Sequence, residues 1–460
     1  MNFFNKLFKT NILNEIFTPN TTAKLTYVKR DNIEEDLEKY LDLPGKQIVL
    51  YGHSGSGKTT LLRNKLREVD YNFIKTHCES NTTFNDILLQ AFDELNRFYI
   101  SEKTTNSSYS ISSEMKAEFK LIGSKINEQH QKTEGNKSVR LLPMQLTPQK
   151  LATFLGEINS VWVIEDFHKV KQEEKLRIAD VIKIFIDSAN DFPKVKIICI
   201  GAVGTARELI ELDNNLNNRV AELHIPLLTE KEIKSIIDKG FDLMNTSIST
   251  DLKEKIVYYS NNLGSITHQI CYDICYHSSI KKSSFFPKTL KDTSFKNAIN
   301  SYVRKNSDTF SKIYDTILCQ NYGWNVLKTF ETLEKDNLTI KEILEKIPTT
   351  KRPSEEELYI YLGQLGSAEY KEIIRFDKDS NKYSISSPFF KAFLNMKFAL
   401  EQSELNERNR KKKNKRSQKY LIDAPVRETI FTVDEEFLIN YNEILDRLIE
   451  NEFKLRKLKK

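Results

Sequence analysis

Long apolar runs are missing from this 460-residue sequence, and its cysteines are few and scattered. No window combines the length and the apolar character of a membrane-spanning helix, so we expect no transmembrane segment. The odd set of cysteines does not suggest a disulfide framework. Because a recognisable signal peptide is also lacking, the sequence predicts a protein of the reducing cytoplasm. The cysteines are Cys78, Cys199, Cys271, Cys275 and Cys319.

The composition, with 39% hydrophobic and 29% charged residues, is typical of a folded protein with sizeable cores. The net charge of +6 is too small to indicate a nucleic-acid partner by itself. Positive charge is concentrated in the run RNRKKKNKRSQK, which begins at Arg408 and ends at Lys419. Such a run either contacts nucleic acid or anionic lipid, or is a solvated linker or helix face.

The residues that follow the apolar segment QIVLY satisfy the P-loop pattern, and a helix is predicted to begin near Lys58. In such a loop, glycines let backbone amides wrap a phosphate, and the helix N-terminus adds partial positive charge. Lys58 can reach the β and γ phosphates, and the Thr59 hydroxyl can bind Mg²⁺. The sequence therefore predicts a site for ATP and Mg²⁺. Its loop residues are Gly52, His53, Ser54, Gly55, Ser56, Gly57, Lys58, Thr59 and Thr60.

Two carboxylates end the motif VWVIED, directly after a fully apolar segment. Acids at this place lie at the carboxyl edge of a buried parallel strand, where ligands bind in such sheets. We predict that Glu165 holds Mg²⁺ together with Thr59 and that Asp166 orients the attacking water. The alternative is an apolar strand followed by an acidic turn. The usual order is Asp first, so the exchanged side-chain lengths predict slow hydrolysis.

Apolar strands alternate with helices up to about residue 225, which predicts an α/β fold with a parallel sheet of the P-loop NTPase type and helices on both faces. A helical lid, a winged helix and a helical tail are expected to follow. The expected parts are an N-terminal helix in 1–19, a P-loop ATPase core in 20–228 with a polar insertion at 99–145, a helical lid in 229–305, a winged helix in 306–402, and a basic linker with a C-terminal helix in 403–460.

The N-terminal segment MNFFNKLFKTNILNEIF sets apolar residues near helical spacing beside Lys6 and Lys9. It either docks on its own domain, which is the commoner outcome for such a segment, or forms a surface helix for a membrane or a partner.

These motifs resemble the AAA+/STAND group of P-loop ATPases, especially the prokaryotic archaeal-type ATPase branch that ends in a winged helix. The resemblance rests on the segment TYVKR, on GHSGSGKTT, on VIEDFH and on the run from Arg219 through HIPLLTEKEI. It implies that Tyr27, Val28 and Arg30 lie against adenine, with Pro226 among the nucleotide contacts. It also implies that Arg219 reaches the γ-phosphate of a neighbouring subunit in a homo-oligomer, the alternative being a solvated or ion-paired arginine.

The sequence departs from this family at two places. After the segment IICI, Gly201 and Ala202 replace the polar residue that senses γ-phosphate, and Thr205 is a weak substitute. The lid segment LGSITH has no sensor arginine, which leaves His268 to contact phosphate or to cap a helix and makes the fit nearer to STAND.

His268, Cys271 and Cys275 also share a helix face, so a metal site is one interpretation and ordinary core packing is the preferred one.

Residues 311–400 predict three helices, a hairpin and a closing helix, which is the order of a winged helix. The expected helices are 313–332, one beginning at Thr339, and 355–365, and the expected strands are 371–376 and 382–385. The third helix, EEELYIYLGQLGSAEY, is acidic and would repel phosphates. We therefore expect this module to dock a protein or to inhibit the ATPase rather than to read DNA.

The function predicted from these features is an ATP-binding and ATP-hydrolysing molecular switch that controls a protein effector. The resemblance extends this prediction to bacterial anti-phage defence, by analogy alone. Two alternatives remain. One is a DNA-binding ATPase of the replication-loading or transposition type, with nucleic acid held through residues 408–419. The other is a nucleotide-locked scaffold with little turnover.

Overall fold

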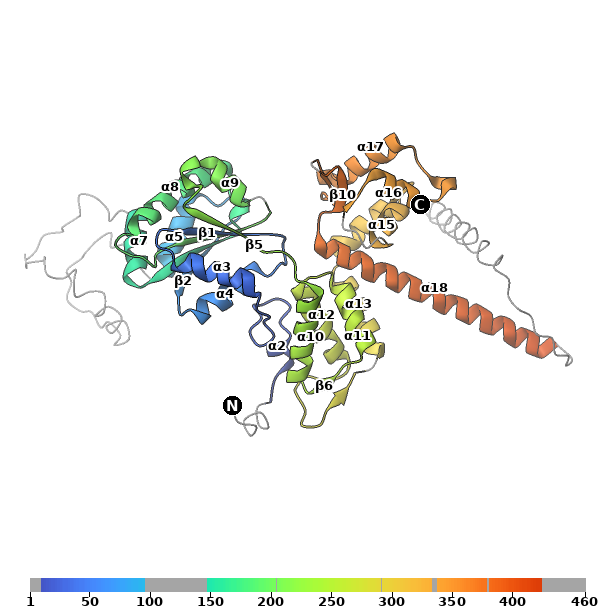
Figure 1. Cartoon of the computed structure of the whole chain (residues 1–460). Coiled ribbons are helices and arrows are strands. Elements are labelled where there is room, and N and C mark those ends of the chain that lie inside the picture. Colours follow the sequence, from blue (N-terminus) through green and yellow to red (C-terminus); the bar gives the residue numbers. More distant parts are fainter. Residues whose placement is uncertain are drawn as a thin grey trace, which may run out of the picture. The chain divides into compact units, whose positions relative to one another are not determined.

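A computed structural model describes residues 10–95, 147–203, 205–290, 292–332, 337–378 and 380–423. The predicted polar insertion at 99–145 and the predicted C-terminal helix after residue 435 lie outside the described residues. The chain up to Leu400 belongs to one unit, and Figure 1 labels the elements that are presented below. Among the helices that the structure describes, none has the length and apolar character needed to span a membrane.

The first part of the chain forms a five-stranded sheet with the strand order β2-β3-β4-β1-β5, and all of its paired strands are parallel. Because β4 pairs with both β1 and β3, the carboxyl ends of these three strands meet at one edge. The strands are β1 (Gln47–Tyr51), β2 (Asn72–His77), β3 (Ser160–Glu165), β4 (Ile197–Gly201) and β5 (Val220–His224). The predicted α/β fold with a parallel sheet is confirmed.

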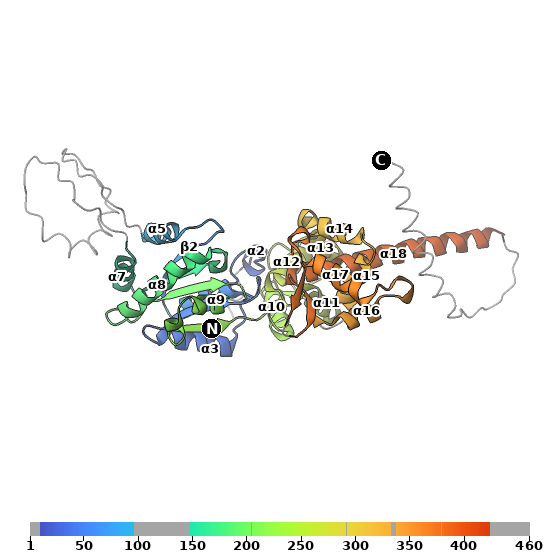
Figure 2. The same cartoon turned by 90° about the horizontal axis from the view of Figure 1, so that it is seen from above.

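Helices cover both faces of this sheet, as the alternation of strands and helices predicts (Figure 2). Successive strand residues point to opposite faces, so Val49 joins the core cluster that contains α5, α7, α8 and α9, whereas Ile48 and Leu50 join the one that contains α3 and α4. The helices are α3 (Asp31–Asp42), α4 (Lys58–Glu68), α5 (Phe84–Glu94), α7 (Pro148–Glu157), α8 (Gln172–Ser188) and α9 (Thr205–Leu212).

A helical lid follows the sheet, with one small parallel strand pair, β6 (Thr246–Ser247) and β7 (Lys288–Thr289). Its first helix begins with a capping box, in which Thr229 and Glu232 satisfy each other's backbone amides. The hydrophobic faces of the lid helices pack into one cluster. The lid helices are α10 (Glu230–Leu243), α11 (Thr250–Ser260), α12 (Gly264–His277) and α13 (Asp292–Lys305).

The described part of the N-terminal segment packs on the lid. Leu13 and Ile16 of helix α2 (Leu13–Ile16) are buried in the lid cluster together with Phe17, whose ring lies 5.3 Å from the ring of Phe241 in α10. Asn11 and Ile12 pair with the chain at 282–283. Residues 10–17 therefore pack on the chain itself, which is the commoner of the two expected outcomes. Residues 1–9 lie outside the described residues.

The residues from 312 to 400, here called the C-terminal module, have the predicted order of helices and hairpin with two differences. The single helix predicted at 313–332 is two helices, because the first ends at Leu318 and the chain turns before Gly323. A two-residue strand, β8, also joins the hairpin in the order β8-β10-β9. The elements are α14 (Lys312–Leu318), α15 (Gly323–Thr332), β8 (Asn337–Leu338), α16 (Ile340–Lys346), α17 (Glu355–Leu365), β9 (Ile374–Asp377), β10 (Lys382–Ile385) and the start of α18 (Pro388–Asp423).

Candidate nucleotide-binding site

The loop between β1 and α4 has a conformation that needs glycine. Gly52 has φ +152°, and a Cβ there would lie 2.2 Å from the carbonyl oxygen of Ile225, which leaves no room for a side chain. Gly57 has φ +87° and is the N-cap of α4. The loop therefore brings the N-terminus of α4 to the carboxyl edge of the sheet, where partial positive charge favours an anion.

Lys58 is the first residue of α4, and its ammonium group lies over the loop. Nζ donates hydrogen bonds to the carbonyl oxygens of Gly52 and His53, at 2.8 Å each. Burial lowers the pKa of Lys58, and the negative charges of Asp166 and Glu165 act in the opposite direction. The lysine is thus within electrostatic reach of both predicted acids, and its charge is in place to neutralise phosphate.

Thr59 and Glu165 meet directly. The Thr59 hydroxyl donates a hydrogen bond of 2.9 Å to Oε2 of Glu165, which is the last residue of β3 and is 8% exposed. These residues are 106 positions apart in the sequence, and the strand order brings them together. A hydroxyl and a carboxylate are the oxygen ligands that Mg²⁺ prefers, so the donor set fits this ion.

Asp166 follows Glu165 but faces a different partner. Its backbone is left-handed, with φ +59°, and its Oδ2 accepts a hydrogen bond from Nζ of Lys169 at 2.7 Å. Both side chains of this ion pair are nearly half exposed, and the hydrogen bond raises the pKa of Lys169. The sequence analysis did not predict that Lys169 pairs with Asp166. Its position three residues after Asp166, at the end of a 3-10 helix, is a usable signal for such a pair.

Arg30 was predicted to lie against adenine, but its guanidinium is engaged with protein groups. Nη2 donates to the carbonyl oxygens of Pro226 and Leu227, at 2.9 Å each, and Nη1 to that of Ser56 at 3.3 Å. Nε forms an ion pair with Glu232 in α10 at 3.1 Å. The residue is 7% exposed. This side chain therefore ties the P-loop to the start of the lid, and the Pro226 carbonyl is one of its acceptors.

Tyr27 and Val28, the other predicted adenine contacts, are half-buried. The Tyr27 hydroxyl donates to Oε1 of Glu34 in α3 at 2.7 Å, and its carbonyl oxygen accepts from Lys239 in α10. Burial and the hydrogen bond to Glu34 raise the pKa of Tyr27 above its ordinary value. The segment is thus fixed between α3 and the lid.

The predicted nucleotide contact of His268 is not supported by its surroundings. The ring is 4% exposed, Nδ1 accepts a hydrogen bond from the backbone amide of Thr18 at 3.0 Å, and the ring of Phe17 lies edge-on at 6.0 Å. Burial lowers the pKa of His268 to about 4. The residue is neutral and part of the lid core, because the N-terminal segment covers it.

A metal site around this histidine is also not found. Cys271 and Cys275 are buried in the lid core, and among the described residues no group of three histidine, cysteine or acidic side chains could hold a metal ion. This agrees with the preferred interpretation, in which both cysteines are apolar core residues.

Arg219 lies apart from the Lys58 site, whereas Thr205 follows the carboxyl end of β4, which pairs with β1. Arg219 is exposed at the start of β5, and its carbonyl oxygen accepts from the amide of Gln47 at the beginning of β1. It therefore lies at the opposite edge of the sheet from the P-loop, and its action on a neighbouring subunit stays a prediction. Thr205 is buried at the first position of α9, and its hydroxyl donates to the carbonyl oxygen of Ala202 at 2.7 Å.

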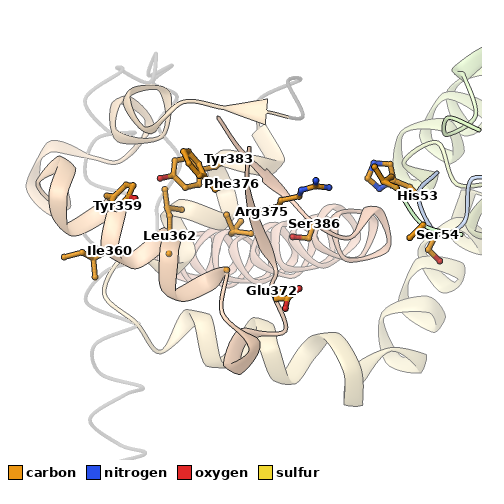
Figure 3. A pocket seen from close by; sticks show the side chains of 15 residues that line it. His53, Ser54, Tyr359, Ile360, Leu362, Glu372, Arg375, Phe376, Tyr383 and Ser386 are labelled. Atoms are coloured by element: carbon orange, nitrogen blue, oxygen red, sulfur yellow. The ribbon is translucent and has the colours of Figure 1, made fainter. Parts of the chain in front are cut away.

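A cavity of about 780 Å³ adjoins the P-loop (Figure 3). Its lining includes His53 and Ser54 of the loop and, from the C-terminal module, Arg375 and Tyr383. In Figure 3 the two loop residues lie on one side and the module's side chains on the other. The outer side of the P-loop therefore faces space that the C-terminal module also lines.

Comparison with known proteins agrees with this geometry. Residues 44–210, which include the P-loop, match the family model described as an AAA domain. A Walker-type ATPase of Pyrococcus abyssi is 15% identical with a TM-score of 0.50, and the match covers 81% of this chain and 97% of that one. This likeness shows the fold.

Two further solved structures are similar at lower scores. The ORC2 protein of Aeropyrum pernix, solved with ADPNP and ADP, is 11% identical with a TM-score of 0.47, covering 85% of this chain and 98% of that one. Cdc6p of Pyrobaculum aerophilum is 13% identical with a TM-score of 0.41, covering 85% and 98%. No curated protein matches the sequence.

Proposed function

We propose that this chain binds ATP with Mg²⁺ at the P-loop, hydrolyses it slowly, and uses the nucleotide state to switch the lid. The observation that carries the proposal is the Thr59–Glu165 hydrogen bond of 2.9 Å beside Lys58. The hydroxyl and the carboxylate form the oxygen pair that a Mg-nucleotide needs.

Each residue has a role in this proposal. The amides of the loop and the N-terminus of α4 bind the phosphates, and Lys58 exchanges the two carbonyl oxygens it now contacts for phosphate oxygens. Thr59 and Glu165 would hold Mg²⁺, which when bound neutralises charge on the β and γ phosphates. Asp166 orients a water molecule whose oxygen attacks the γ-phosphorus, as the bond to the bridging oxygen of ADP breaks.

Slow turnover follows from the surroundings of Asp166. Its carboxylate is already paired with Lys169, so a water molecule must compete with that ammonium group for the carboxylate oxygens. The acid in the Mg²⁺ position is the longer glutamate and the acid in the water position the shorter aspartate. A scaffold that binds ATP with negligible turnover is the limiting case of the same site.

Arg30 supports the switching part of the proposal. It contacts Ser56 inside the P-loop and Glu232 on the first lid helix, so a nucleotide that reshapes the loop also displaces a contact of the lid. By the resemblance given above, the lid and the C-terminal module would then act on a protein effector, with anti-phage defence as one setting. The genes beside this one would identify that effector.

The test measures ATP affinity with a fluorescent analogue, and phosphate release, for the wild type, Lys58→Ala and Asp166→Asn. We expect binding by the wild type, loss of binding for Lys58→Ala, and loss of release with retained binding for Asp166→Asn. Equal inactivity of the wild type and Asp166→Asn, with ATP still bound, supports the scaffold. Absence of ATP binding by the wild type contradicts the whole proposal.

A second candidate, a DNA-binding ATPase, has one observation in its favour. Helix α18 continues to Asp423 and so carries the basic run through its whole length. The test replaces the basic residues within 411–416 by glutamine and measures DNA affinity over a series of salt concentrations. A steep salt dependence that the variant loses favours DNA binding; weak, salt-independent binding by both proteins contradicts it.

A further inference from the structure

The most exposed large hydrophobic side chains of the described residues are two neighbours in the loop between α12 and β7. Phe285 and Phe286 are 69% and 74% exposed, and no other large apolar side chain that the structure describes reaches these values. The loop lies at the β6 end of the lid (Figure 1). Two adjacent phenylalanines in water are unfavourable unless they serve a contact.

The backbone of this loop is fixed. The side-chain amide of Asn245 donates to the carbonyl oxygens of Ser284 and Phe285, at 2.8 and 3.0 Å. After the aromatic pair, the amide of Lys288 donates to the carbonyl oxygen of Asn245 at 3.2 Å, and β7 pairs with β6. The loop is therefore held on both sides of the pair, and the exposure of the rings is a feature of the fold.

The same loop interacts with the N-terminal segment. Ser283 donates its amide to the carbonyl oxygen of Asn11, and Ser283 Oγ accepts from the amide of Asn11, at 2.9 Å each. The residues before this pairing read MNFFNKLFKT, which combines phenylalanine and lysine without any acidic residue. Of these ten residues the structure describes only Thr10, so the pairing of Asn11 with Ser283 is the described link between the two segments.

Along the chain, the charged residues next to the aromatic pair have one sign. Residues 274–291 contain four lysines and no aspartate or glutamate. Lys281 and Lys282 precede the phenylalanines and Lys288 follows them, and all three are exposed. The apolar pair is therefore bracketed by positive charge, and its partner must accept aromatic rings and carry negative charge at its surface.

We propose that this loop, residues 281–288, binds the surface of an anionic lipid bilayer. In this arrangement the rings of Phe285 and Phe286 enter the boundary between head groups and acyl chains. The three lysines stay at the level of the lipid phosphates, where a negative surface potential attracts them. The proposal concerns a surface separate from the P-loop and does not depend on ATP binding.

The geometry of the rings favours a bilayer over single-stranded nucleic acid. Their centroids are 5.3 Å apart and their planes are at 87°. Successive bases of one strand lie roughly parallel to one another and stack on ring faces that are also roughly parallel. Two perpendicular rings cannot both stack on successive bases in this way. A bilayer makes no demand on ring orientation, because the gain comes from the apolar area removed from water.

The test is flotation of the full chain with vesicles of phosphatidylglycerol and phosphatidylcholine in equal parts, and with phosphatidylcholine vesicles. We expect binding to the anionic vesicles only, weakened by salt. Phe285→Ser/Phe286→Ser is expected to weaken it about tenfold or more, and Lys281→Gln/Lys282→Gln/Lys288→Gln to a similar degree. The matched control, Leu89→Ser/Leu176→Ser, removes two apolar side chains that are 46% and 47% exposed elsewhere, and should bind as the wild type does.

Thermal unfolding and ATP binding are measured for each variant, and both should equal the wild-type values because the changed side chains are exposed. The proposal is overturned if the wild type does not float with anionic vesicles or if both loop variants float as it does. It is also overturned if the loop variants instead lose binding to single-stranded DNA, or if they change the mass of the protein in solution, which would indicate a contact between copies.

Discussion

Arg30 and Glu232 form an ion pair of 3.1 Å between the segment before α3 and the first helix of the lid. The side chains are 6% and 18% exposed, so water screens their attraction weakly. The same guanidinium donates to three backbone carbonyl oxygens, one of them in the P-loop. Loss of this side chain removes the donor of three carbonyl oxygens and the cation beside Glu232, whose other oxygen still accepts from Thr229.

Arg30→Ala is therefore expected to lower the free energy of unfolding by about 3 kcal/mol. The adjacent exposed pair is the matched control: Lys29 and Glu68 are 58% and 43% exposed, so Lys29→Ala should leave the free energy of unfolding nearly unchanged. Urea unfolding followed by the fluorescence of the buried Trp162 measures both. Equal effects of the two substitutions would show that burial of the Arg30 pair contributes little.

Glu165→Gln should remove the advantage that Mg²⁺ gives to ATP binding. The affinity of the wild type for ATP is expected to be lower in EDTA than in Mg²⁺ by a factor of about ten or more. The variant keeps the hydrogen bond from Thr59 but loses the negative charge, so its affinity should respond much less to EDTA. The control is Glu173→Gln, an exposed acid in α8. An unchanged response in Glu165→Gln would remove this residue from the proposed metal site.

Lys169→Ala should increase ATP turnover several-fold, because the substitution releases the carboxylate of Asp166 from its ion pair. Asp166→Asn should decrease turnover by about a hundredfold or more, as expected for loss of a group that assists proton transfer. Phosphate release under saturating ATP measures both, with the exposed Lys171→Ala as control. A lower rate in Lys169→Ala would mean that this lysine itself assists hydrolysis.

Because His268 is buried, we expect the free energy of unfolding to decrease in acid. Its pKa is lowered to about 4 in the folded chain, against about 6.5 when unfolded. Between these two pH values the unfolded state binds one more proton than the folded state. The contribution of His268 to the free energy of unfolding is therefore fully present above pH 6.5 and decreases as the pH falls toward 4, by about 3 kcal/mol in total.

The check on this prediction compares urea unfolding between pH 7 and pH 4.5 for the wild type, His268→Gln and His277→Gln. His277 is exposed at the end of the same helix and serves as the control. His268→Gln should show a smaller pH dependence than the other two proteins. The same dependence in all three would assign the loss to other groups.

Much of the fold could be predicted from local sequence. Apolar segments followed by helices identified the strands of the parallel sheet, because a strand buried on both faces needs a continuous apolar run. The P-loop was identifiable because its glycines, lysine and threonine are neighbours in the chain. The break between α14 and α15 and the two-residue strand β8 could not be predicted, since neither has a periodic signal of its own.

The candidate site divides in the same way. The sequence by itself determined which residues form the loop at Lys58, and that a buried strand ends in Glu165 and Asp166, because these depend on neighbours along the chain. Tertiary structure alone decided that Thr59 meets Glu165, that the Arg30 guanidinium joins the P-loop to the lid, and that His268 is covered by the N-terminal segment. These contacts join residues up to 250 positions apart, and their partners follow from strand order and helix packing, which no local pattern records.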